Sequence, residues 1–271
     1  MNFVQFAEAH GLILKGIEGD GRWHRVPTTD KPRHRNGAYK YLGDVAFVQN
    51  HATMAEVAVW KANTSIGPID ATTIRRQQAI AKREVEEQQR AAAKVASEAL
   101  RNATLSTHPY LARKGFPDEM GLVDDGMLLI PMRDYANYRN VLSVQRISPT
   151  GEKKFLYGGR SRGAVFKIGN GRERWFCEGY ATGLSIKAAL ESMYRQATVV
   201  VCFSANNMEL VAKDQPGYVF ADNDASETGQ KAAEAIGSPW VMSPMVGEDA
   251  NDYMQRMGVP ALAKLMREVY G

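Results

Sequence analysis

Acidic side chains follow apolar runs in the C-terminal third of the chain, at spacings that suit metal-dependent phosphate chemistry. The stretch YVFADNDASETGQKAA places Asp222 and Asp224 two positions apart, directly after an apolar run. Alternate residues of an extended segment point the same way, so both carboxylates can share one ion. Other apolar runs of the same region are followed by Glu178, Asp249 and Asp252. Carboxylates this close repel each other unless a cation or water lies between them.

These residue types favour a hard divalent cation. Carboxylate oxygens in small number suit Mg²⁺ or Mn²⁺, which keep waters and substrate phosphates in their coordination shells. Two such ions can activate the attacking oxygen and stabilise the leaving oxygen of a phosphoryl displacement. A structural alternative stays open, in which Asp222 ends a strand and Asp224 or Ser226 caps the helix that follows.

The region from residue 173 onward alternates apolar runs with helix-like segments. The apolar runs are RWFCEGY, ATVVVCFS, GYVFADND and PWVMSP. Strands of continuous apolar residues separated by helices predict a parallel sheet that is covered on both faces. Ligands of such sheets bind at the carboxyl ends of the strands. We therefore expect the acidic residues to converge at one rim of the sheet.

The composition fits a folded, mildly basic protein. The chain has 271 residues, 44% hydrophobic residues and a formal net charge of +4. No apolar run approaches the ~20 residues that cross a bilayer, and the N-terminus lacks a signal-peptide pattern. Cys177 and Cys202 lie in separate apolar runs and are predicted to be buried free thiols of a reducing compartment. We therefore expect a cytoplasmic protein without a membrane partner.

Four segments are predicted from changes in composition and apolar pattern along the chain. A small α+β module with aromatic, Gly-punctuated strands is predicted first, and then a helical linker that contains neither Gly nor Pro over residues 70–102. A strand-rich basic subdomain precedes the alternating region. The predicted bounds of the four segments are 1–68, 69–105, 106–170 and 171–271.

The N-terminal module interleaves basic residues with aromatic ones in the stretch GRWHRVPTTDKPRHRNGAYKY. Charge for phosphates and flat faces for bases are what a surface for single-stranded nucleic acid needs. The candidate DNA-binding residues are Arg22, Trp23, Arg25, Arg33 and Arg35. The alternative is a solvated loop in which Trp23 and the tyrosines pack in a small core.

Several stretches resemble the TOPRIM domain shared by bacterial-type primases and topoisomerases, in its phage and plasmid primase form: CEGYATGLSI, VVVCFSANN, YVFADNDASETGQKAA and GEDANDYMQ. The upstream stretches YLARKGF, LLIPMRD, SVQRIS and KKFLYGGRSRGAVFKIG resemble the basic half of a primase core. The N-terminal stretch resembles the DNA-recognition module of phage primase–helicases. The resemblance implies an α/β fold: a Rossmann-like TOPRIM domain with a parallel sheet, preceded by a basic α+β primase subdomain and a small α+β module joined by the long helix.

The resemblance also implies roles for individual residues. Glu178, Asp222 and Asp224 are expected to be catalytic and to bind metal, and Asp252 matches a later metal-binding acid, with Asp249 as its near competitor. The basic residues expected to face the template and the nucleoside triphosphates are Arg133, Arg146, Lys154 and Lys167. Arg160 and Arg162, in the Gly-rich stretch YGGRSRGA, can hold phosphate oxygens in the same way, with backbone donors helping.

Two features depart from the family pattern. Residues 1–68 contain no Cys, and their histidines are His10, His24, His34 and His51. A closed structural zinc site takes four ligands at short paired spacings, so no zinc is expected. The chain also lacks the Gly-x-x-x-x-Gly-Lys-[Ser/Thr] phosphate loop. A helicase motor is therefore expected either on a separate chain or in a part of a longer protein outside this sequence.

These observations predict a DNA-dependent primase that makes short primers on single-stranded DNA by two-metal nucleotidyl transfer. Its partners would be Mg²⁺ or Mn²⁺, the template, nucleoside triphosphates and a replicative helicase, near the nucleoid of a bacterial host. Two alternatives stay open. One is a TOPRIM nuclease that uses water as the nucleophile, and the other is a non-catalytic nucleic-acid-binding initiation protein.

Overall fold

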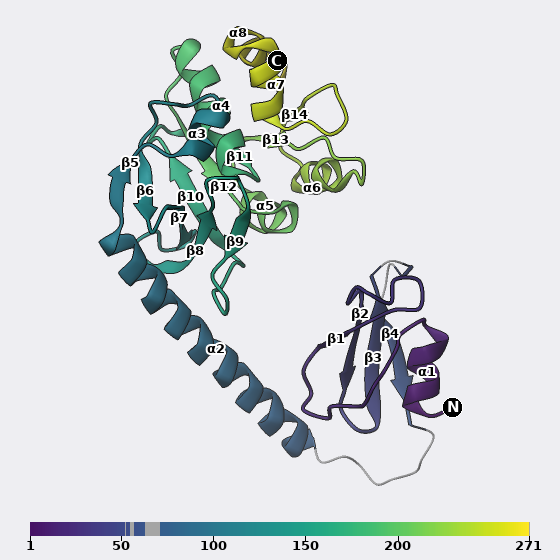
Figure 1. Ribbon diagram of the computed structural model, residues 1–271. Helices are drawn as coiled ribbons and strands as arrows, with labels where there is room; N and C mark the ends of the chain where they lie inside the picture. The colour runs from purple at the N-terminus through teal and green to yellow at the C-terminus, as the bar shows by residue number, and fades with distance from the viewer. Residues whose placement is uncertain (52, 55–56, 63–70, 271) are drawn as a thin grey trace. The chain divides into compact units, whose positions relative to one another are not determined.

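A computed structural model describes residues 1–51, 53–54, 57–62 and 71–270, with the side chains described from residue 82 onward in the long helix. The chain divides into two compact units, Met1–Glu87 and Gln88–Gly271 (Figure 1). The boundary predicted between residues 68 and 69 lies outside the described residues.

The N-terminal unit contains a helix and an antiparallel sheet. Helix α1 (Phe3–Ala9) begins at Asn2, whose side chain accepts a hydrogen bond from Gln5 N at 2.9 Å while the Gln5 side chain accepts one from Asn2 N. Phe3 packs in one apolar cluster with Tyr39 and Val48 of the sheet. The strands described here, in spatial order, are β1 (His24–Val26), β2 (Gly37–Tyr41), β3 (Val45–Asn50) and β4 (Ala58–Lys61). The predicted α+β character is confirmed.

Helix α2 (Ala71–Asn102) is the long helix that the sequence predicts. Its C-terminal half carries a narrow buried stripe that includes Ala92 and Ala96. Ala96 packs in one cluster with Leu129 and Val144 of the second unit. Small side chains allow the helix to lie close to the sheet, so this half of α2 is part of the second unit.

The second unit is built on one mixed sheet. Among the described residues the strand order is β14-β13-β11-β12-β10-β7-β6-β5, and β8 pairs with β7 and β9. The strands are β5 (Thr104–Ser106), β6 (Gly121–Asp124), β7 (Met127–Asp134), β8 (Val141–Ile147), β9 (Lys153–Phe155), β10 (Ala164–Ile168), β11 (Glu173–Cys177), β12 (Ala197–Val201), β13 (Tyr218–Ala221) and β14 (Trp240–Met242). The last four are parallel to one another, as predicted, whereas β10 joins β12 antiparallel.

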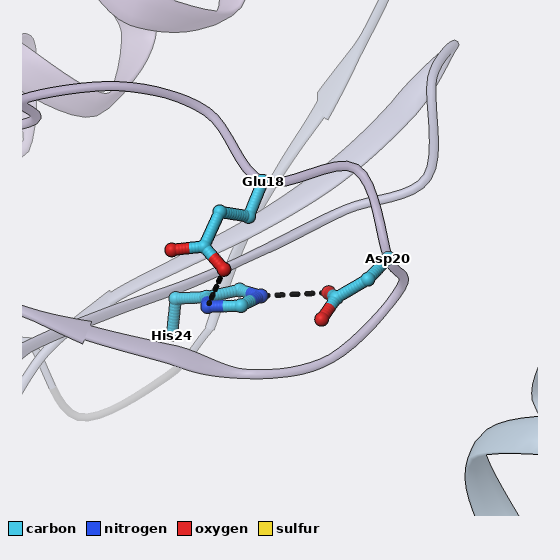
Figure 2. A group of neighbouring side chains, drawn as sticks. All are labelled: Glu18, Asp20 and His24. Atoms are coloured by element: carbon cyan, nitrogen blue, oxygen red, sulfur yellow. Dashed lines mark hydrogen bonds and ion pairs between the residues drawn. The ribbon is translucent and has the colours of Figure 1, made fainter.

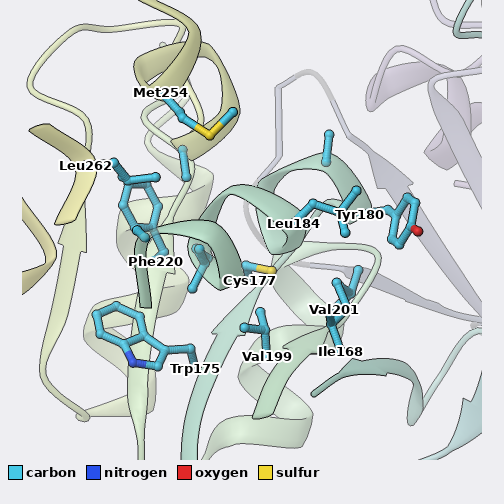
Figure 3. Packing of buried hydrophobic residues seen from close by; sticks show 14 of the residues in the cluster. Ile168, Trp175, Cys177, Tyr180, Leu184, Val199, Val201, Phe220, Met254 and Leu262 are labelled. Carbon is cyan, nitrogen blue, oxygen red and sulfur yellow. The ribbon is translucent and has the colours of Figure 1, made fainter. Parts of the chain in front are cut away.

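Helices cover both faces of the parallel part. They are α3 (Pro109–Arg113), α4 (Tyr180–Ser192), α5 (Ala205–Ala212), α6 (Thr228–Ile236), α7 (Ala250–Met257) and α8 (Val259–Arg267), and a short 3-10 helix spans Glu268–Tyr270. Helices α4, α7 and α8 pack with Trp175, Cys177 and Phe220 on one face (Figure 3). Helices α5 and α6 pack with Phe176 and Val219 on the other face. Strand side chains alternate between the faces, which explains why these runs are apolar throughout.

Two further predictions concern the cysteines and the membrane. Cys177 and Cys202 are buried and unpaired, as predicted. In the part of the chain that the structure describes, no helix has both the length and the apolar character needed to span a bilayer. The mixed sheet is continuous from β7 through β10 to β12, and the boundary expected between residues 170 and 171 stays a prediction.

The packing of α2 on the second unit predicts the effect of a larger side chain at Ala96. Ala96→Leu should lower the free energy of unfolding by about 1–3 kcal/mol, because overpacking forces neighbouring atoms apart. The neighbouring Val95 is 52% exposed, so Val95→Leu is the matched control and should change it by less than about 0.5 kcal/mol. Urea unfolding followed by circular dichroism measures both. Equal losses in the two variants would contradict this packing.

Candidate active site

Two neighbouring strands end at the candidate site. Strand β11 is followed at once by Glu178, and strand β13 by Asp222. The two strands pair in parallel, so the residues that follow them lie at the same edge of the sheet. At Gly229, in the first turn of α6, a Cβ atom would lie 2.3 Å from the Asp222 carbonyl oxygen. A glycine is therefore needed for α6 to begin this close to Asp222.

The loop before α7 is tied to the loop after β13. Asn223 N donates a hydrogen bond to the Glu248 carbonyl oxygen at 3.2 Å, and Asn223 Nδ2 donates to the Ser243 carbonyl oxygen at 2.9 Å. The Glu248 carboxylate is held in turn by Arg256, with Nε at 2.7 Å from Oε1. Asp249 follows Glu248 in the chain and is the N-cap of α7. The pairing of the two loops therefore brings a third acidic position to this edge.

Asp222 is the most crowded of these carboxylates. Burial, together with the negative charges of Glu178, Asp249 and Asp224, raises the pKa of Asp222 from 3.8 to about 8, while Lys153 acts in the opposite direction. The Oδ1 atom of Asp222 is buried and, among the residues that the structure describes, has no hydrogen-bond partner. A buried polar atom without a partner costs free energy. The site is thus suited to a ligand that brings positive charge to this oxygen, and a carboxylate set of this kind fits a divalent cation.

Asp224 and Glu178 have different environments. The Ser226 hydroxyl donates to Asp224 Oδ1 and Gly229 N donates to Asp224 Oδ2 at 3.1 Å, and such hydrogen bonds lower the pKa of Asp224 to about 2. The helix-capping alternative holds only in part: Asp224 accepts hydrogen bonds from Thr228 N and Gly229 N at the start of α6, but the N-cap position itself is Glu227. Burial and the charge of Asp224 raise the pKa of Glu178, against a backbone hydrogen bond from Ala205.

Asp252 lies in the first turn of α7 and has another partner. Its Oδ1 atom is 3.3 Å from Lys114 Nζ, and its Oδ2 atom accepts a hydrogen bond from Asp249 N at 3.4 Å. The Asp249 carboxylate accepts a hydrogen bond from the Thr182 hydroxyl at 3.0 Å, and its negative charge raises the pKa of Asp222. Asp249 is thus close enough to Asp222 for the two charges to interact. A metal-binding role for Asp252 stays a prediction.

Lys153 carries a positive charge that lowers the pKa of Asp222. The motifs in the sequence do not single out this lysine. The neighbouring Lys154 is exposed, and its Nζ atom lies 2.9 Å from a carboxylate oxygen of Glu152. Lys154 is paired across the strands with Arg146. Directly opposed residues share a face of the sheet, so Arg146 and Lys154 lie on the face opposite to Lys153. The sequence shows two adjacent lysines, and strand alternation alone does not tell which of them faces the acids.

The other predicted nucleotide-binding residues lie elsewhere in the second unit. Arg133 and Lys167 meet at Tyr138: Arg133 donates to the Tyr138 carbonyl oxygen at 3.4 Å, and Lys167 Nζ lies 4.6 Å from the centroid of the ring. Arg160 lies 3.7 Å from the carboxylate at the end of β7, and Arg162 is exposed. Their roles stay predictions.

The N-terminal unit gathers part of its predicted DNA-binding set. One pocket of about 610 Å³ is lined, among others, by Trp23, Arg25 and Arg35. Trp23 is 47% exposed, so its ring is accessible, whereas Tyr39 and Tyr41 pack in the small core as the alternative expected. Arg22 forms an ion pair with Glu84, and Arg33 is exposed.

A second acidic group surrounds His24 in the N-terminal unit. Figure 2 shows the imidazole between two carboxylates, with Nδ1 at 3.4 Å from Glu18 Oε2 and Nε2 at 2.7 Å from Asp20 Oδ1. The expected ligand spacings of a zinc site concern cysteines and histidines, so they do not indicate these carboxylates. Their ligand atoms lie within 4.8 Å of one another. Three ligands are one fewer than a closed zinc site takes, and the absence of zinc stays a prediction.

Residues 174–259 match the family model described as Toprim domain, and this span runs from β11 to the start of α8. The chain is also similar to one chain of a solved structure, with 17% sequence identity and a TM-score of 0.42. That structure is described as bacteriophage T7 lagging-strand DNA polymerase interacting with primase domains of two gp4 subunits bound to an RNA/DNA hybrid and dTTP. The match covers 63% of this chain and 93% of that chain. Residues 174–259 therefore form a Toprim domain, as the sequence predicts.

Proposed function

We propose that this chain is a DNA-dependent primase that makes short primers by divalent-metal nucleotidyl transfer. The observation that carries the proposal is the buried Oδ1 atom of Asp222, which has no hydrogen-bond partner among the described residues and lies at the same edge of the sheet as Glu178. Several carboxylates close to one such oxygen suit Mg²⁺ or Mn²⁺. The resemblance of the stretches upstream of residue 171 to primase cores favours primer synthesis over other Toprim chemistries.

In this proposal the side chains have separate tasks. Asp222, Glu178 and Asp224 hold the metal, and Asp249 adds negative charge beside them. A bound divalent cation neutralises charge on the transferred phosphate. Lys153 would donate a charge-assisted hydrogen bond to a phosphate oxygen, which its electrostatic effect on Asp222 supports. The primer 3′-hydroxyl forms a new bond to the α-phosphorus, the bond to the β-phosphate oxygen breaks, pyrophosphate leaves and the hydroxyl proton passes to water.

The N-terminal unit supplies the template contact in this proposal. Trp23 offers an accessible ring for base stacking, and Arg25 and Arg35 line the same pocket and offer charge to phosphates. A replicative helicase on a separate chain and the cytoplasm of a bacterial host remain part of the proposal.

Substitutions at the acidic edge test the proposed reaction. Asp222→Asn and Glu178→Gln should each reduce primer synthesis by more than about 100-fold, because even the loss of a partner outside the metal's ligand set costs 10–100-fold in many sites. The assay uses single-stranded DNA, labelled nucleotides and Mg²⁺ or Mn²⁺. Asp118→Asn, at an exposed acid outside the site, is the matched control. Full synthesis by both site variants would reject the assignment, and metal-dependent cutting of DNA without nucleotides would identify a nuclease.

The raised pKa of Asp222 predicts how the stability of the metal-free protein depends on pH. The native pKa is about 8 and the ordinary value is 3.8, so between these values the native state binds more protons than the unfolded state. The free energy of unfolding should therefore fall as the pH rises from about 4 to about 8. Thermal denaturation in EDTA should show a flatter dependence in Asp222→Asn.

Manganese should oppose this fall in the free energy of unfolding with rising pH, because it binds the ionised carboxylates of the native state. We expect Mn²⁺ to raise Tm more at about pH 8 than at about pH 6 in the unmodified chain, and to have a much smaller effect in Asp222→Asn. A pH dependence that Asp222→Asn leaves unaltered would show that another group titrates.

A further inference from the structure

A cationic pocket lies at the edge of the sheet where β11 and β12 begin. Its volume is about 740 Å³, and its lining includes Lys167, Arg172, Arg174 and the two rings of Tyr135 and Tyr138. The acids of the candidate active site follow the other ends of the parallel strands. The two sites are thus separated by the length of strand β11, which is about 16 Å for five residues.

In the part of the chain that the structure describes, the positive groups of this pocket have no acidic partner. Lys167 Nζ lies 5.4 Å from the ring centroid of Tyr135 and 4.6 Å from that of Tyr138. Arg174 donates to the neutral Gln215 Oε1 at 3.3 Å. Within the described ranges, no carboxylate forms an ion pair with Lys167, Arg172 or Arg174. Burial and the charge of Arg174 lower the pKa of Lys167, as expected where like charges lie near each other.

The two tyrosines hold the pocket in place. The Tyr138 hydroxyl accepts a hydrogen bond from Lys167 N at 2.8 Å, and the Tyr135 hydroxyl donates to Gln215 Oε1 at 3.3 Å. Burial raises the pKa of both tyrosines, so they stay neutral near pH 7. Lys167 lies over both rings, so charge is a better basis for binding here than stacking of a base on the tyrosines.

We propose that this pocket binds phosphate groups of a nucleotide or of a single nucleic-acid strand, at a site separate from the acidic edge. Arginine presents a planar fork of N–H donors that matches phosphate oxygens, and lysine adds a compact positive charge. Arg133, which also contacts Tyr138, lies beside this set. The volume falls within the range of ordinary ligand sites, so it suits the phosphates of a free nucleotide as well as those of a strand.

The test uses the full chain in EDTA, so that it does not depend on a metal or on the acids. The double variant Arg172→Ala/Arg174→Ala is compared with Lys264→Ala/Arg267→Ala, which removes the same charge from exposed positions of α8. Binding of a labelled oligothymidylate is measured by anisotropy over a range of salt concentrations. Contacts elsewhere in the chain are common to all variants, so the difference between them reports on the pocket.

Loss of two strand contacts should reduce the slope of log affinity against log salt by about 1.4, since each phosphate contact contributes about 0.7 for a single strand. The α8 control should keep the parent slope. A second arm measures dTTP binding in the same buffer. A loss confined to dTTP would assign the pocket to free nucleotides, and a loss of slope would assign it to the strand.

Unchanged binding of both the strand and dTTP would overturn the proposal. Circular dichroism and Tm verify that the variants fold. Arg172 is exposed, so Arg172→Glu alone provides a second variant that leaves the packing intact, and it should weaken binding in whichever arm the double variant affects. Arg174→Lys keeps the charge and should retain most of that binding. Primer synthesis tests the acids separately, so the failure of one proposal is distinguishable from the failure of the other.

Discussion

Repulsion between carboxylates around Asp222 is the constraint on which the candidate site depends. Parallel pairing fixes the ends of β11 and β13 side by side, and the absence of a side chain at Gly229 lets α6 begin against the Asp222 backbone. The acids therefore cannot separate without disturbing the sheet or α6. The packing of the sheet holds the negative charges together, and a cation between them recovers part of that cost. Protonation of Asp222, whose pKa is about 8, relieves the same repulsion when no metal is bound.

The continuity of the sheet explains how positive charge reaches this edge. Strand β10 joins the parallel strands to β7, and β7 carries β8 and β9. The region that is rich in basic residues is therefore attached rigidly to the Toprim strands by backbone hydrogen bonds. Strand alternation then sorts its side chains: Lys153 faces the acids, whereas Arg146 and Lys154 share the opposite face.

The sequence predicts the parallel strands and the acids that follow them, because buried strands are continuous apolar runs and parallel strands end at a common edge. It does not separate Lys153 from Lys154, since two adjacent residues of a strand differ only in which face they occupy. It also does not rank Asp249 against Asp252, because their roles depend on how the loop before α7 pairs with Asn223. The Arg172–Arg174 pocket forms from two turns and three strands, and no local pattern indicates it.

The two aspartates of the DND stretch illustrate why capping and metal binding are not competing explanations. Asp224 accepts hydrogen bonds from Ser226 and from the first turn of α6, and these keep its pKa near 2. Asp222 has a buried oxygen without any donor. The start of helix α6 thus keeps Asp224 charged near neutral pH, and that charge contributes to the raised pKa of Asp222. Of these two aspartates, Asp222 is the one that must lose a proton when a cation binds, and Glu178, whose pKa is also raised, is a second group whose protonation opposes metal binding.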